Sequence, residues 1–184
     1  MEIHRLIKDR WSPVAFSDKK PGRDTIKLLF RAASMAPSSY NIQPWKFIYG
    51  IKGDDAVYDT LFELLMDGNK AWAFTAPVLA MSIIETVPPG RDSQNKYAWH
   101  DTGMAVGNLL LQAMDLELYL HQMGGFDHDG AKDILNLPEN HTPGAMMAIG
   151  YKGDPSVLKP EIAKRDNDRT VRKPLEEFVF SEKF

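Results

Sequence analysis

The sequence predicts an α+β domain of three layers, in which a mixed central sheet of four or five strands is flanked by helices on both faces. Segments with helical apolar spacing alternate with short aromatic or β-branched runs. One run, 78–84, is apolar except for Ser82, as expected of a strand buried on both faces. The longest helical pattern, 99–118, is apolar nearly all round, which indicates burial on two sides.

The first half of the chain predicts two helices and one strand. Residues 23–35 carry apolar side chains at helical spacing, with Asp24 placed to cap the first turn. Residues 45–50 are aromatic and β-branched and end in glycine, which predicts a strand. Residues 54–66 form a second amphipathic pattern, which we expect to end at the pair Asp67-Gly68.

The second half predicts the central strand at 78–84, the long helix at 99–118, and then a strand at 119–123, a helix at 127–135 and a strand at 145–150.

The long helix and the tail after Tyr151 both predict a homodimer. A domain of this size has too little of its own material to cover both sides of the 99–118 helix, so the second side is expected to meet another copy of the chain. The tail closes with the apolar stretch 175–180, which is too apolar to be left in water. We therefore expect the C-terminal tail to be exchanged with the partner subunit.

Composition excludes several classes of protein. The 184 residues show no repeat or linker, so a single domain over residues 1–184 is expected. The net charge of −3, without a basic block, argues against nucleic-acid binding. No cysteine is present, which excludes disulfides, thiolate metal sites and a cysteine nucleophile. The charged N-terminus and the lack of a long apolar run argue against a signal peptide and a membrane span, so a cytoplasmic location is expected.

Sequence motifs for side-chain catalysis are missing. The five histidines are scattered, no serine lies in a nucleophile elbow, and neither a phosphate loop nor a dinucleotide fingerprint is present. The sequence therefore predicts no catalytic side chain and no metal site. If the protein is an enzyme, the chemistry belongs to a bound cofactor.

One loop is dense in groups that recognise ligands. Residues 36–47 read Ala-Pro-Ser-Ser-Tyr-Asn-Ile-Gln-Pro-Trp-Lys-Phe. Its hydroxyls and amides supply uncharged donors and acceptors, and its prolines stiffen the backbone. Such a loop suits a planar heterocycle; the alternative is a polar connection closed by turn chemistry.

This loop resembles that of the FMN-dependent nitroreductase family, in which an Asn-x-Gln-Pro-Trp element is found. The resemblance extends from residue 10 to residue 177 and implies the family's fold and its homodimer. Further blocks match in the family's order, at 10–16, 69–78, 101–113, 121–127 and 172–177.

The resemblance implies an FMN site at matching positions. The phosphate, which favours fork-shaped cationic donors, would meet Arg10, Ser12 and Arg172, with Arg169 nearby in sequence. Asn69 would grip the pyrimidine edge of the ring, and a backbone N–H at Gly125 would approach the flavin nitrogen N5. Loop residues would reach the flavin of the other subunit. The full set of implied cofactor-binding residues is Arg10, Trp11, Ser12, Pro37, Ser38, Ser39, Asn41, Asn69, Gln122, Met123, Gly124, Gly125 and Arg172.

Three positions depart from the family's pattern. Trp11, Val14 and Trp72 stand where relatives often carry cations. Losing these donors is expected to weaken the contacts with FMN by about 1–2 kcal/mol each, unless the remaining arginines compensate.

The function implied by the resemblance is an oxidoreductase that passes a hydride from NADH or NADPH, by way of FMN, to an electron-poor acceptor such as a nitroaromatic or a quinone. One alternative keeps the fold but changes the flavin reaction to dehalogenation, flavin fragmentation or dehydrogenation. Another is a flavin-binding dimer without turnover. The stretch 85–98 is either a lid over the substrate or an ordinary surface loop.

Overall fold

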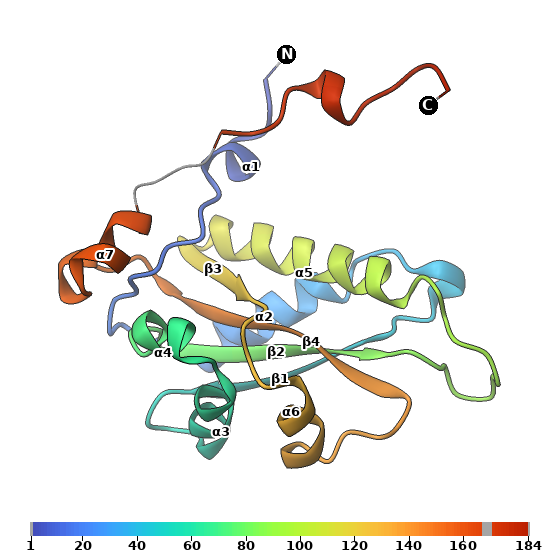
Figure 1. Ribbon diagram of the computed structural model, residues 1–184, viewed down its shortest axis with the longest axis horizontal. Coiled ribbons are helices and arrows are strands. Elements are labelled where there is room, and N and C mark those ends of the chain that lie inside the picture. Colours follow the sequence, from blue (N-terminus) through green and yellow to red (C-terminus); the bar gives the residue numbers. More distant parts are fainter. Residues whose placement is uncertain (1, 167–170, 184) are drawn as a thin grey trace.

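The computed structural model describes residues 2–166 and 171–183, and its centre is a four-stranded sheet (Figure 1). The strand order is β1-β2-β4-β3, and every neighbouring pair is antiparallel. The expected mixed sheet is therefore wrong for the described residues. An apolar run indicates that a strand is buried on both faces, but it does not indicate whether the strand runs parallel or antiparallel to its neighbours. The strands are β1 (Trp45–Ile51), β2 (Val78–Glu85), β3 (Leu118–Met123) and β4 (His141–Tyr151).

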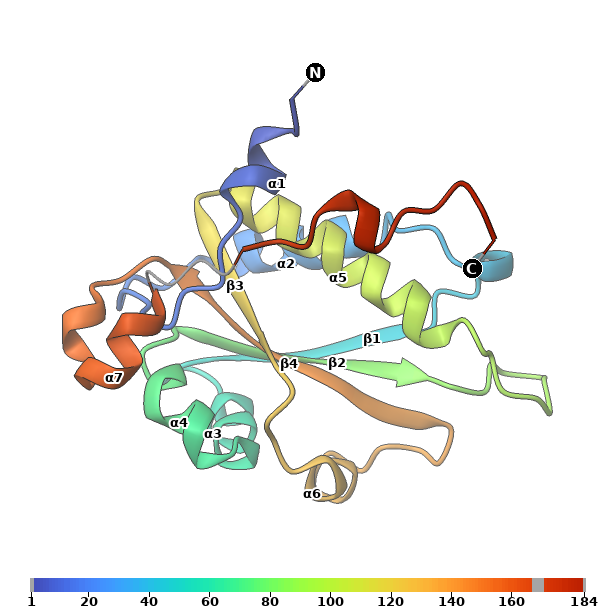
Figure 2. The same cartoon turned by 45° about the horizontal axis from the view of Figure 1, so that its top comes forward.

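Helices cover both faces of this sheet, so the predicted three layers are confirmed (Figures 1 and 2). On one face lie α2 (Arg23–Ala33) and α5 (Ala98–Asp115), and on the other lie α3 (Ala56–Leu64), α4 (Asp67–Ala73) and α6 (His128–Ile134). Each face has its own apolar cluster. All eight residues of β2 are buried, and six of them are apolar, which agrees with a strand covered on both faces; the two polar ones are Ser82 and Glu85.

The remaining elements are short. They are α1 (Arg5–Asp9) near the N-terminus, α7 (Pro160–Ala163), and four 3₁₀ turns: η1 (Ser39–Asn41), η2 (Pro155–Val157), η3 (Lys164–Asp166) and η4 (Leu175–Glu177).

The sequence prediction missed α4. The helix expected over 54–66 ends at Leu64, and α4 begins at Asp67, where the pair Asp67-Gly68 had indicated a stop. Tertiary contacts stabilise this short helix. Trp72 is fully buried in the core, and the carbonyl of Met66 accepts hydrogen bonds from the N–H groups of Asn69 and Lys70 at 2.8 and 2.9 Å. Strand β4 also starts four residues earlier than predicted, at His141.

Helix α5 is buried on one side only within this chain. Ala105, Leu109 and Ala113 lie in the core, whereas Met104 and Leu111 on the other side are half-buried and Trp99 is 57% exposed. Residues 171–183 of the tail are all exposed, including five large apolar side chains, Val171, Leu175, Phe178, Val179 and Phe180. The single chain thus leaves two apolar surfaces uncovered.

No helix within the described ranges is both long and apolar enough to cross a membrane.

Candidate functional site

The fold brings together two of the predicted site residues, Asn69 and Gly125. Asn69 lies in α4, and Gly125 lies in the turn that follows β3. The Asn69 side chain donates a hydrogen bond from Nδ2 to the Gly125 carbonyl oxygen at 2.9 Å, and the Met66 N–H donates to the same oxygen at 3.0 Å. A bridge between Leu65 and Phe126 holds the two segments side by side. The turn and the start of α4 therefore form one unit.

The two glycines of this turn differ in their surroundings. A Cβ added at Gly125 would lie 2.9 Å from Asn69 Nδ2, so the close approach of the amide requires glycine there. A Cβ at Gly124 would meet nothing within 4 Å. Among the residues that the structure describes, no acceptor takes the N–H of Gly125. The turn thus presents a free backbone donor beside the Asn69 amide.

Arg10 and Ser12 form a second group of predicted residues. The Arg10 guanidinium donates from Nη1 to Ser12 Oγ at 3.0 Å, and both residues are half-buried, as is Trp11 between them. Arg10 also lies close enough to His121 to affect its ionisation. Burial lowers the pKa of His121, and the positive charges of Arg165 and Arg10 lower it further, against a hydrogen bond to the Pro13 carbonyl at 2.8 Å that raises it.

Sequence reasoning missed Arg165. The neighbouring Asp166 carboxylate is buried and accepts a hydrogen bond from the Val14 N–H at 2.8 Å. Lys152 Nζ lies 3.5 Å from the other oxygen of the same carboxylate. These contacts hold η3 against the segment that follows Ser12, and Arg165, like Arg10, lies close enough to His121 to lower its pKa. No local sequence motif indicates this position of Arg165.

Two of the three departures from the family pattern, Val14 and Trp72, lie in the core. Val14 is 1% exposed, and Trp72 is fully buried. The Trp72 ring lies 4.4 Å from that of His121 and 6.4 Å from that of Phe16, measured between centroids. Within the described part of the chain, the buried indole N–H of Trp72 has no hydrogen-bond acceptor. Both side chains belong to the apolar cluster on the sheet face covered by α3, α4 and α6, and packing there accounts for apolar residues at these positions.

Pro37, Ser38, Ser39 and Asn41 lie elsewhere, in the loop around η1. Figures 1 and 2 show this loop beyond the N-terminal end of α5, at the opposite end of the molecule from α7. The Ser39 N–H donates to the buried Asp101 carboxylate of α5 at 3.0 Å. Within one subunit, these residues therefore lie far from the group around Arg10.

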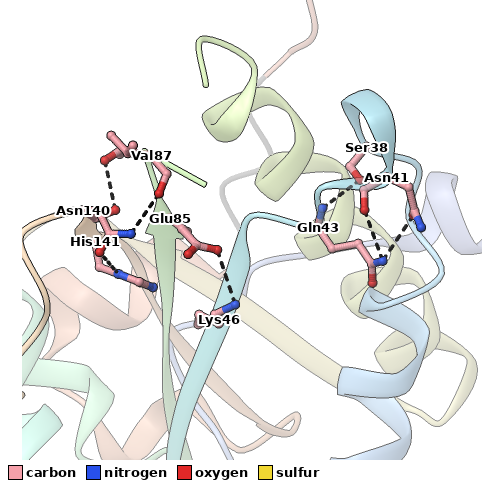
Figure 3. Close-up of polar contacts among 9 residues, drawn as sticks. Ser38, Asn41, Gln43, Lys46, Glu85, Val87, Asn140 and His141 are labelled. Atoms are coloured by element: carbon pink, nitrogen blue, oxygen red, sulfur yellow. Dashed lines mark hydrogen bonds and ion pairs between the residues drawn. The ribbon is translucent and has the colours of Figure 1, made fainter. Parts of the chain in front are cut away.

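The η1 loop has an unusual backbone. Tyr40, Asn41 and Gln43 have φ angles of 52°, 56° and 53°, a region that side-chain-bearing residues rarely adopt. Gln43 N–H donates to Ser38 Oγ at 3.0 Å, and Gln43 Nε2 donates to Asn41 Oδ1 at 3.2 Å (Figure 3). Such strain, of about 1–3 kcal/mol per residue, is concentrated in proteins at functional sites.

The 85–98 stretch is anchored at its start. Asn140 Nδ2 donates to the Val87 carbonyl at 2.8 Å, and Asn140 Oδ1 lies 2.9 Å from His141 Nδ1 (Figure 3). Further along, the Arg91 guanidinium lies 5.6 Å from the centre of the Tyr40 ring. The stretch therefore contacts the η1 loop rather than the turn at Gly125.

The other predicted residues are scattered around these groups. Met123 is buried in the core, and Arg172 is exposed in the tail. Arg169 lies outside the described residues. Gln122 lines a hollow of about 140 Å³ with Trp99, Thr102 and Gly144 among its neighbours. Ligand pockets usually measure about 300–1,000 Å³, so this hollow needs a further wall to hold a ligand of flavin size.

A larger hollow of about 550 Å³ contains none of the predicted residues. Its charged side chains largely have partners within the chain. Lys20 pairs with Asp54 at 2.6 Å, and Lys52 donates to the Phe74 carbonyl at 2.5 Å. It offers a ligand few unpaired groups. The described residues also contain no group of three side chains that could hold a metal ion.

The chain is similar in sequence and in fold to proteins of one known family. The profile of the Nitroreductase family matches residues 7–68 and 51–151. A crystal structure described as an oxidoreductase containing FMN is 33% identical, with a TM-score of 0.93, over 100% of this chain and 93% of that chain.

Two curated relatives differ in the activity that their names state. A protein of Archaeoglobus fulgidus, provisionally named an NADH dehydrogenase/NAD(P)H nitroreductase, is 27% identical over 83% of this chain and 87% of its own length. The iodotyrosine deiodinase of Thermotoga neapolitana is 25% identical over 86% of this chain and 92% of its own length.

Proposed function

The chain belongs to the nitroreductase family of oxidoreductases, and from this premise we propose that it binds FMN and transfers a hydride from NADH or NADPH to an electron-poor acceptor such as a nitroaromatic or a quinone. The observation that carries the proposal is the free N–H of Gly125 beside the Asn69 amide. When bound, FMN would supply the hydride chemistry at N5, which the side chains of this protein lack.

The residues present fit the ring of FMN. The flavin edge offers both hydrogen-bond donors and acceptors, and the turn at Gly125 offers a backbone donor that nothing in the described chain uses. Asn69 donates one amide hydrogen to the Gly125 carbonyl, which leaves its Oδ1 and its second N–H available to a ligand. Gly124, with no neighbour within 4 Å of a Cβ, leaves the approach to the turn open.

The residues also fit the phosphate. Arg10 donates a hydrogen bond to Ser12, and Arg165 on η3 lies, like Arg10, close to His121. Two guanidinium groups and a hydroxyl are strong partners for a phosphate, which carries close to two negative charges. In this proposal Arg165 supplies the charge that is absent at Val14 and Trp72.

We further propose that the active protein is a homodimer. The hollow at Gln122 is too small to hold a flavin within one subunit. In the proposed dimer, the exposed side of α5 and the exposed apolar tail of the partner supply the missing wall. The strained η1 loop, with Ser38, Ser39 and Asn41, would then contact the flavin of the partner. Removing residues 171–184 is expected to yield a monomer that loses FMN, as measured by light scattering and absorbance. A truncated chain that stays dimeric and yellow would disprove the role of the tail.

The deiodinase relative supports a second candidate, reductive dehalogenation at the same site. It needs the same FMN and the same Asn69 and Gly125 contacts, and differs only in the acceptor.

The visible spectrum of the purified protein tests the proposal. We expect a flavin spectrum that bleaches on anaerobic addition of NADH or NADPH, and turnover with menadione or nitrofurazone. Reduction followed by turnover only with an iodinated tyrosine favours the second candidate. Flavin that binds but is not reduced indicates a binding protein without turnover. Protein that stays colourless after FMN is added refutes the proposal.

A further inference from the structure

We propose that His128 is a positioning residue that acts through the peptide group between Gly124 and Gly125. Its imidazole polarises this peptide by bonding to the carbonyl, and so makes the Gly125 N–H a stronger donor to the flavin nitrogen N5. The inference rests on the proposed function, because N5 is present only when FMN is bound.

His128 is well placed for this role. It is the first residue of α6, and its Nε2 lies 3.3 Å from the Gly124 carbonyl oxygen. Its ring stacks on that of the fully buried Phe126, with a centroid distance of 3.8 Å and an interplanar angle of 26°. A carbonyl oxygen can only accept, so the contact requires a hydrogen on Nε2. Both the imidazolium and the neutral ring with its hydrogen on Nε2 meet that requirement.

The neighbouring contacts leave one donor of the turn for a ligand. The Phe126 N–H also donates to the Gly124 carbonyl, at 3.2 Å, and Asn69 holds the Gly125 carbonyl at 2.9 Å. Both peptide planes on either side of Gly125 are thereby fixed. Within the described residues, the Gly125 N–H is the group of these two peptides that remains without a partner.

Peptide resonance links the two ends of one amide group. Electron density drawn toward a hydrogen-bonded carbonyl leaves the N–H of the same peptide more positive. Hydrogen bonds in such chains strengthen one another. The His128 bond at the Gly124 carbonyl therefore strengthens the donor at Gly125, although the imidazole itself does not touch the flavin in this proposal.

The effect should depend on the oxidation state of the flavin. N5 accepts a hydrogen bond in oxidised FMN but carries its own hydrogen after hydride uptake. A stronger Gly125 donor therefore favours binding of the oxidised form over the reduced form. Losing that donor strength weakens binding of oxidised FMN more than binding of reduced FMN, and by linkage raises the midpoint potential of the bound flavin.

Three variants of the FMN-loaded protein test this. His128→Phe keeps a ring to stack on Phe126 and removes the donor, whereas His128→Gln keeps an N–H donor without the ring. Asp129→Asn changes a neighbouring charge and leaves the Gly124 contact in place. The measurements are the dissociation constant of oxidised FMN, from flavin fluorescence, and the midpoint potential of the bound flavin.

We expect His128→Phe to bind oxidised FMN three- to tenfold more weakly and to bind reduced FMN as tightly as the wild type does. A three- to tenfold difference between the two forms raises the midpoint potential by about 15–30 mV, since tenfold corresponds to about 30 mV for a two-electron couple. His128→Gln and Asp129→Asn should stay within twofold of the wild type. Equal constants and potentials for His128→Phe and the wild type would overturn the inference.

Further outcomes separate the possible failures. Equal losses in His128→Phe and His128→Gln would overturn the inference, since the ring shape and not the donor would then matter. A thermal unfolding midpoint measured without FMN identifies a variant that is merely destabilised. If His128→Phe is destabilised, the variants with Asn, Gln and Phe at position 128 are compared. The inference then requires that the midpoint potential is raised only in the variant without an N–H donor. A wild type that binds no FMN at all refutes the proposed function itself, which is a different result.

Discussion

Replacing Gly125 by alanine places a Cβ 2.9 Å from Asn69 Nδ2, which is closer than real Cβ contacts come. The amide is the end of a flexible side chain, so it can move away, but its hydrogen bond to the Gly125 carbonyl is then lost. A neutral hydrogen bond of this kind contributes about 0.5–1.5 kcal/mol to the free energy of unfolding. For a chain of 150–250 residues, each kcal/mol corresponds to about 2–4 °C in Tm. We therefore expect Tm to fall by about 1–6 °C.

The matched control is Gly124→Ala. A Cβ there meets nothing within 4 Å, and neither glycine has a positive φ angle. Both substitutions reduce the freedom of the unfolded chain equally, so the difference between the two Tm values isolates the contact with Asn69. Calorimetry of both variants without FMN is the assay. If Gly125→Ala is as stable as Gly124→Ala, the close approach of Asn69 does not constrain the turn, and the reasoning is refuted. We also expect Gly124→Ala to slow flavin reduction by NADPH, because its methyl group stands in the open approach.

Three other predictions concern the Arg10 end of the molecule. Arg10→Ala and Arg165→Ala should each weaken FMN retention in dialysis by about tenfold or more, as expected for loss of a charged hydrogen bond, with little change in Tm of the FMN-free protein; full retention in both would show that the phosphate binds elsewhere. Asp166→Ala leaves the buried Val14 N–H without its acceptor, so we expect a loss of about 1–3 kcal/mol in a urea titration, and an unchanged midpoint would contradict this. Because burial lowers the folded-state pKa of His121, the unfolded chain binds more protons just below the ordinary histidine pKa of about 6.5. Its contribution to stability is therefore present above about pH 6.5 and is lost as the pH falls below that value. His121→Phe should show a shallower fall in Tm over that range, and parallel curves would count against the assignment.

The sequence predicted the residues of the turn at Gly124 and Gly125 better than it predicted helix α4, which lies beside that turn. A motif match pointed to Asn69 and to the glycine pair, and the structure brings them to 2.9 Å. The helix that carries Asn69 was not predicted, because Gly68 lies in its first turn and is a poor helix former. Burial of Trp72 in the core stabilises α4 in spite of that glycine. Tertiary packing outweighed local propensity.

The interpretation of Val14 and Trp72 shows a different limit. Compared with the family pattern, Val14 and Trp72 were interpreted as positions that have lost a cation, and this implied weaker binding of FMN. In the structure both side chains are buried, and the Trp72 ring packs against His121. Arg165, meanwhile, has no motif around it. Its segment is held in place by the hydrogen bond from the Val14 N–H to Asp166, across 152 residues, and Arg165 lies, like Arg10, close to His121. A contact at that separation leaves no periodic trace in the sequence.

The sequence by itself determined most of the segments that form strands and helices, and which residue types are available for chemistry. Burial of one side of a helix or strand is written along the chain as a period of 3.6 or 2 residues, and the absence of cysteine is read directly. Only the tertiary structure decided that the sheet is antiparallel, that α4 exists, that Arg10 and Arg165 both lie near His121, and that the η1 loop lies at the far end from them. These features follow from how distant segments pack together, and packing energies depend on contacts that no local pattern encodes.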